Sequence, residues 1–181
     1  MKFQTAELLA DLIARTEQNI KDVQLLQQQS VDRLNKKASP DSWSALEAIE
    51  HLNLYSDFYM PEIKKCITES KFSRPSKEFK SGVLGNYFAN SVADKPKLNK
   101  MKTFVDKNPN GSELGVDVLE KFLDYQKTTL ELLDTSRKVD LKKTRTAISI
   151  SKTLKLRLGD TCRVVIYHNQ RHISQAKRAV V

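Results

Sequence analysis

The sequence predicts an all-α protein, built as a four-helix bundle with two long crossover connections. Apolar residues recur at three- and four-residue steps in four separate segments, which is the pattern of helices with one buried face. Glycine and proline number only five each in 181 residues. A chain of this length can bury one sizeable core, so we predict a single domain over residues 1–181.

The first helix is expected from about Thr5 to Gln29. Glu7 and Asp11 interrupt its apolar pattern, so the segment lacks the continuous apolar core of a signal peptide. No apolar run approaches the roughly 20 residues that cross a bilayer. We therefore expect a cytoplasmic protein with no membrane partner. The inward face of this helix is formed by Leu9, Leu12, Ile13, Thr16, Ile20, Val23 and Leu26.

The second helix has a well-defined start. Ser44 and Glu47 form an S-x-x-E capping box, in which each side chain bonds to the backbone of the other residue. The helix is expected to continue to about Ser70. Pro61 should kink or divide it, because proline removes one backbone hydrogen bond. The apolar stripe consists of Ala48, Leu52, Tyr55, Tyr59 and Ile63.

Residues 71–112 are polar and rich in helix breakers, so they are predicted to form a long connector with one short helix. Loops of this length in compact domains are usually functional or ordered against the core. We expect this connector to cover one end of the bundle. The short helix would contain the apolar cluster Val83, Leu84, Tyr87, Phe88 and Val92.

The third helix is predicted from about Ser112 to Arg137. Residues 146–158 then alternate apolar and polar side chains, which indicates an extended segment, although too little strand is present for a sheet. Asp160 is predicted to be the N-cap of the fourth helix, which ends at about Ala179.

The three histidines of the chain all fall on core-facing positions of predicted helices. His168 and His172 are four residues apart, so their Cβ atoms should lie about 5 to 6 Å apart on one face. His51 offers a third nitrogen from a facing helix. Buried imidazoles without polar partners are costly, whereas three protein ligands with one open position are typical of catalytic zinc sites. The spacing predicts one divalent metal ion, and we favour zinc or nickel.

An alternative stays open, in which each histidine is an ordinary core or boundary residue. Other ligands are excluded by distance, since Cys66 lies about 22 Å along its helix from His51 and Cys162 about 9 Å before His168. Both thiols are predicted to be packing residues. Residues one turn from a histidine, or beside one, are candidate contacts for a substrate. They are Tyr55, Arg171 and Gln175.

Two motifs in combination resemble the DinB-like superfamily. The first is W-S-x-x-E-x-x-x-H-L at residues 43–52, and the second is H-x-x-R-H-x-x-Q at residues 168–175. The resemblance covers nearly the whole chain in helix order and connector placement. It implies a bundle with two crossover connections and a three-histidine metal site at one end of a cleft. Characterised relatives include thiol S-transferases that use bacillithiol, mycothiol or glutathione, and a mycothiol-dependent isomerase.

One residue departs from the pattern of the superfamily. Asn169 stands where many relatives have an acidic residue directly after the first histidine of the pair. This leaves the metal ligands intact but removes a proton-transfer group. The same stretch, H-N-Q-R-H, lacks the glutamate base of a zincin peptidase.

These observations predict a metal-dependent enzyme that transfers a low-molecular-weight thiol to an electrophile. Tyr55, Arg171 and Gln175 would contact the reactants, and Tyr87 and Phe88 of the connector would hold the thiol cofactor. A metal-dependent hydrolase is one alternative, with water at the open position. A non-catalytic binding bundle with a basic surface is another.

The net charge of +9 raises the question of a polyanionic partner. No aromatic-interleaved stripe, zinc finger or RNP-like motif accompanies the basic residues, so we expect a solvated basic surface and no nucleic-acid partner. The expected partner is a small-molecule substrate, and a homodimer stays open. The basic residues are densest in the connector, at Lys95, Lys97, Lys100, Lys102 and Lys107.

Overall fold

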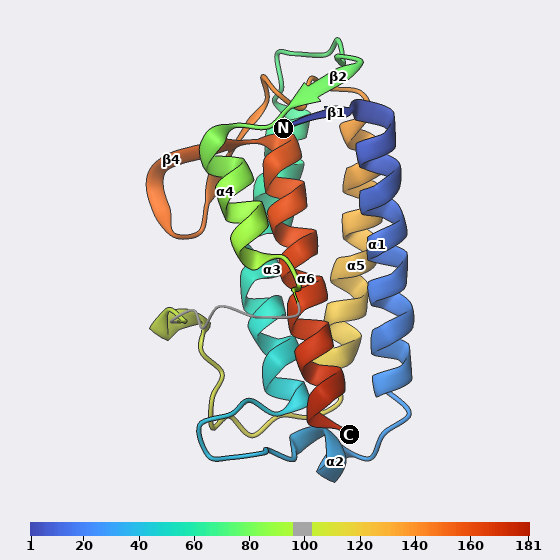
Figure 1. Cartoon of the computed structure of the whole chain (residues 1–181), viewed down its shortest axis with the longest axis vertical. Helices are drawn as coiled ribbons and strands as arrows, with labels where there is room; N and C mark the ends of the chain where they lie inside the picture. The colour runs from blue at the N-terminus through green and yellow to red at the C-terminus, as the bar shows by residue number, and fades with distance from the viewer. Residues whose placement is uncertain (96–102) are drawn as a thin grey trace.

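Four long helices lie side by side in the part of the chain that the structure, a computed structural model, describes, which is residues 1–95 and 103–181 (Figure 1). The prediction of an all-α protein is confirmed. α1 and α3 each pack against both α5 and α6. The four helices are α1 (Thr5–Leu26), α3 (Ala45–Thr68), α5 (Asp117–Ser136) and α6 (Leu158–Ala179).

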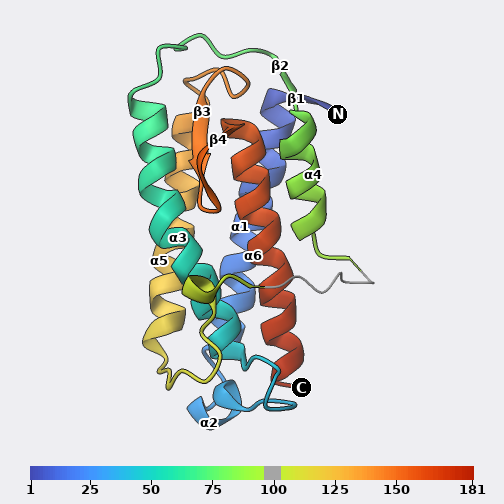
Figure 2. The same cartoon turned by 90° about the vertical axis from the view of Figure 1, so that its left-hand side faces the viewer.

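The helix directions explain the lengths of the connections. α1 and α6 run one way along the long axis, and α3 and α5 run the other way (Figures 1 and 2). α3 and α5 are therefore parallel neighbours, and the connector between them, residues 69–116, must return along the length of the bundle. Residues 137–157 between α5 and α6 begin and end at the same end. Of the two long connections, only the first crosses from one end to the other.

Most of the shorter elements lie in the connections between the four long helices. α2 (Val31–Asn35) joins α1 to α3, and the connector contains β2 (Glu78–Lys80), α4 (Val83–Val92) and the 3-10 helix η1 (Val105–Lys107). Of the connector lysines, Lys97, Lys100 and Lys102 lie outside the described residues.

Two small antiparallel sheets are present among the described residues. β1 (Lys2–Gln4) pairs with β2, and β3 (Arg145–Ile148) pairs with β4 (Ser151–Arg157). The predicted extended segment thus folds back on itself as a β3–β4 hairpin, so the expectation that too little strand is present for a sheet is wrong. The β1–β2 pair was not predicted, because three-residue strands are too short to show an alternating pattern.

α3 begins and continues as one helix. The capping box is present: the Glu47 N–H donates to Ser44 Oγ at 3.1 Å, and the Ser44 N–H donates to Glu47 Oε2 at 2.8 Å. The helix is not divided at Pro61. Pro61 and Asp57 both lie on the exposed face, where the Asp57 carbonyl that loses its partner can bond to water.

The predicted role of Asp160 as the N-cap of α6 is wrong. α6 begins at Leu158, so its N-cap position is Arg157, three residues before Asp160. The buried Asp160 carboxylate instead accepts hydrogen bonds from the Gly82 N–H, at 2.8 Å, and from the Ser81 hydroxyl. Because Gly82 is the N-cap of α4, Asp160 caps the connector helix and fastens it to α6.

Two apolar clusters fill the interior of the bundle. One lies toward the end where α6 begins and includes Leu9, Ile63 and Ile166, and the other lies toward the opposite end and includes Leu46 and Ile173. Within the described residues, no helix combines the length and the apolar character needed to cross a membrane.

Candidate metal centre

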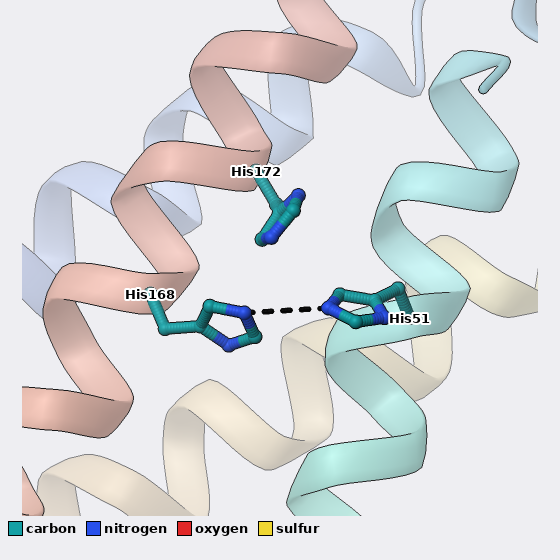
Figure 3. A group of neighbouring side chains, drawn as sticks. All are labelled: His51, His168 and His172. Carbon is teal, nitrogen blue, oxygen red and sulfur yellow. Dashed lines mark hydrogen bonds between the residues drawn. The ribbon is translucent and has the colours of Figure 1, made fainter. Parts of the chain in front are cut away.

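The three histidines converge from two facing helices (Figure 3). α3 supplies His51, one turn after the capping-box residue Glu47, and α6 supplies His168 and His172 from one face. The Nε2 atoms of His51 and His168 are 3.3 Å apart, and one ligand atom from each histidine lies within 4.8 Å of the others. The i, i+4 spacing on α6 and the fixed start of α3 therefore bring together the whole predicted ligand set.

Two of the rings are oriented by carbonyl oxygens. His51 Nδ1 lies 2.6 Å from the backbone oxygen of Lys107, and His172 Nδ1 lies 2.9 Å from the side-chain oxygen of Gln175. A carbonyl oxygen only accepts, so each Nδ1 carries the proton and donates it. Each Nε2 then keeps a free lone pair. Metal-bound histidines use this arrangement, in which the other ring nitrogen donates to a carbonyl or carboxylate.

Burial keeps all three imidazoles neutral. Desolvation lowers the pKa of His51 to about 4 and that of His172 to about 3, from an ordinary value of 6.5. The pKa of His168 is also lowered well below 6.5, by desolvation and then by its two histidine neighbours. Neutral imidazoles are the form that binds a metal ion, so these residues can hold one divalent cation without first losing protons at neutral pH.

Aromatic rings enclose the histidine cluster. The Trp43 ring centroid lies 4.7 Å from that of His51 and 5.7 Å from that of His172. The Tyr55 ring lies 5.0 Å from both His51 and His168. Trp43 was not predicted to contact the histidines. Its place in the W-S-x-x-E-x-x-x-H motif was the signal that could have assigned it to the site.

A cavity of about 880 Å³ opens onto the histidines. Four of the five predicted contact residues line it, namely Tyr55, Phe88, Arg171 and Gln175. Tyr87 does not, because it lies on the outer side of α4 with 65% of its surface exposed. Two further groups of residues that line the cavity were not predicted from the sequence. They are the connector residues Thr103, Phe104, Val105, Asn108 and Asn110, and the hairpin residues Ile148, Ser149, Ile150 and Leu156.

The polar residues of the cavity differ in what they can do. Burial raises the pKa of Tyr55 to about 12, so its hydroxyl stays protonated and can donate a hydrogen bond. Arg171 is buried beside α4, where its Nη1 lies 3.4 Å from the Ser91 carbonyl oxygen. Asn169 donates to Gln126 Oε1 on α5 at 3.4 Å, so it supports the packing of two helices where many relatives carry an acid.

The two cysteines lie apart from the metal centre. Neither is among the described residues that line the cavity. Burial raises the pKa of Cys66 to about 11 and that of Cys162 to about 12, so both thiols are protonated at neutral pH. A protonated thiol is a poor nucleophile and a poor metal ligand.

The fold and this cluster define an all-α protein in which three histidines are placed so that they could hold one metal ion. The chain belongs to the DinB superfamily, whose family model matches residues 14–176 and so includes all three histidines. Neither a search of curated proteins nor a search of solved structures returned a significant match.

Proposed function

We propose that this protein is a metal-dependent enzyme that transfers a low-molecular-weight thiol to an electrophile in the cytoplasm. The observation that carries the proposal is the incomplete ligand set, three neutral imidazoles facing a cavity of about 880 Å³. Three protein ligands leave one position for a reactant. His51, His168 and His172 would hold zinc or nickel, and the bound ion would supply a Lewis acid that favours the thiolate form of a thiol at neutral pH.

The thiol transfer balances without an oxidant or reductant. The sulfur forms a bond to the electrophilic carbon, the leaving group departs with its bonding electron pair, and the proton of the thiol passes to water. Tyr55 can donate a hydrogen bond to the leaving group, because its hydroxyl stays protonated. The Arg171 guanidinium supplies a positive charge at the cavity wall, which suits the carboxylates of peptide-like thiols.

Neither cysteine of the chain is a better nucleophile for this reaction. Cys66 and Cys162 are remote from the cavity lining and protonated, as their raised pKa values require. An external thiol explains why a large cavity faces the histidines and why Asn169 replaces an acidic residue. A thiol that is already ionised needs no protein base.

The proposal is tested by conjugation of a chromogenic aryl halide with a panel of cellular thiols. His51→Ala is compared with a Cys66→Ser, Cys162→Ala double variant, each reloaded with metal. We expect the histidine variant to lose activity and the cysteine variant to retain it. The reverse result would refute the mechanism. Turnover of an ester with no thiol present would support hydrolysis instead.

A further inference from the structure

The cavity extends well beyond the histidines in one direction. On α3, His51, Tyr55 and Tyr59 line it at successive turns, a span of about 12 Å along the helix. α6 runs antiparallel to α3, so Val165 and Val164 continue the opposite wall beyond His168. The β3–β4 hairpin lies between the two helices and closes this end (Figure 2). We call this part the apolar lobe, formed by Tyr59, Phe88, Ile148, Leu156, Val164 and Val165.

The polar groups of the apolar lobe are already paired. The Tyr59 hydroxyl lies 3.3 Å from Ser149 Oγ on the hairpin, and the Ser56 hydroxyl donates to the Leu52 carbonyl at 2.9 Å. An apolar ligand in the lobe would therefore leave these two hydrogen bonds in place. The lobe favours hydrocarbon over polar groups.

The charged groups of the cavity lie level with the histidines or beyond them, away from the apolar lobe. Among the described lining residues other than histidine, the ionised side chains are Asp41, which precedes α3, and Arg171, which follows His168 along α6. Gln175, Asn108 and Asn110 also belong to this end. A charged thiol fits there, and the lobe on the far side of the histidines stays available for a second molecule.

The cavity is large enough for a drug-sized molecule. About 880 Å³ is in the upper part of the range of roughly 300 to 1,000 Å³ that encloses a drug-sized molecule. A site that handled only a small polar substrate would not require an apolar extension two helical turns long.

We propose that the electrophile is an uncharged molecule with an extended alkyl or aryl group, and that this group occupies the apolar lobe. This inference rests on the proposed thiol transfer. The reacting carbon lies at the histidine end, where it forms its bond to sulfur and releases the leaving group with the bonding pair, while the thiol proton passes to water. Selection among electrophiles then depends on the length of the apolar group.

Equilibrium binding tests the lobe without any reaction. Unreactive primary alcohols from butanol to decanol are titrated into the purified protein by calorimetry. We expect affinity to rise about three- to fourfold for each added methylene until the lobe is filled. Val164→Phe narrows the lobe and should shorten the chain length at which affinity stops rising, whereas Val164→Ala should lengthen it. Affinity that does not depend on chain length would overturn the inference.

Val116→Phe is the matched control. Val116 is an exposed residue at the N-cap position of α5 and does not line the cavity, so its substitution should leave the chain-length profile unchanged. Identical profiles for Val164→Phe and Val116→Phe, with both proteins folded by circular dichroism, would also overturn the inference.

Binding in the apolar lobe and thiol transfer are tested separately, so each can be contradicted without the other. Chain-length-dependent binding by a protein that conjugates no thiol would support the apolar lobe and contradict thiol transfer. Thiol transfer whose kcat/KM is the same for short and long alkyl electrophiles would support the proposed function and overturn the lobe.

Discussion

The Nδ1–H of His51 donates to the backbone carbonyl of Lys107, with 2.6 Å between the two heavy atoms, and so joins α3 to the connector. One turn before His51, the buried Glu47 carboxylate holds the same connector through the N–H of Gly111. Gly111 has a φ of 81°, a left-handed conformation that suits glycine. Glu47, which completes the capping box of α3, therefore also holds the connector segment whose carbonyl orients the His51 ring.

Glu47→Ala is expected to lower both stability and metal affinity. The variant loses the capping box, leaves the Gly111 N–H without its acceptor and removes one of the two acceptors of the Lys37 ammonium, a cost of roughly 2 to 4 kcal/mol in free energy of unfolding. Metal affinity should fall because the Lys107 carbonyl is no longer held in place. Urea unfolding and zinc titration measure the two effects.

Glu50→Ala is the matched control, because Glu50 lies on the same helix and accepts from Asn53. Glu47→Gln should recover part of the metal affinity, since its amide oxygen can still accept from Gly111. If Glu47→Ala unfolds more easily but binds zinc as tightly as wild type, Glu47 acts only as a helix cap.

Gln175→Ala is expected to weaken metal binding by about 10- to 100-fold, because His172 loses the acceptor that orients its ring. His172→Ala, which removes the ligand itself, should have a larger effect. Gln175→Glu should retain affinity, since a carboxylate also accepts from Nδ1. Competition with a chelating dye measures the zinc affinity of these three variants. Equal zinc affinity in Gln175→Ala and wild type would leave Gln175 with a role toward the substrate alone.

The sequence was sufficient to predict the helices and the clustering of the three histidines because both depend on local spacing. A 3.6-residue period identifies a buried helical face, and the i, i+4 pair on such a face places His168 beside His172 in any helix. The capping box fixed the start of α3, and with it the position of His51 relative to the bundle.

The sequence was not sufficient where a residue acts on a distant segment. Asp160 looks like an N-cap, but its partner is the start of α4, 78 residues earlier in the chain. The Lys107 carbonyl, 56 residues from His51, belongs to the backbone and has no signature in the side-chain pattern. The Phe88 and Tyr87 side chains are adjacent in sequence, yet only the packing of α4 on α6 decides that Phe88 faces the cavity.

Gly85→Ala is expected to destabilise the protein, although alanine normally stabilises the interior of a helix by about 0.5 to 1 kcal/mol relative to glycine. A Cβ atom at Gly85 would lie 2.4 Å from the Asp160 carboxylate, which is buried and fixed by its own hydrogen bonds. We expect a loss of roughly 1 to 3 kcal/mol by urea unfolding, as for overpacking in a core.

Gly82→Ala provides the comparison for Gly85→Ala. A Cβ atom there would lie 3.4 Å from the nearest Asp160 oxygen, an ordinary contact, and the backbone φ of −72° accepts alanine. The Gly82 variant should stay within about 1 kcal/mol of wild type. If both variants are equally stable, α4 is not held rigidly against Asp160.

The metal-free protein is expected to lose stability as the pH falls below 6.5. Each buried histidine has a folded-state pKa below its unfolded value of 6.5, so the unfolded chain binds more protons in the window from 6.5 down to about 4 for His51 and about 3 for His172. The free energy of unfolding therefore decreases with falling pH, by up to about 1.4 kcal/mol per pH unit for each histidine. Well above pH 6.5 the three residues are neutral in both states and contribute no slope. Urea unfolding of chelator-treated protein across this range measures the effect, and His51→Gln should reduce the slope by about a third. An equal slope in wild type and in His51→Gln would contradict the assignment, because the titrating groups would then lie elsewhere.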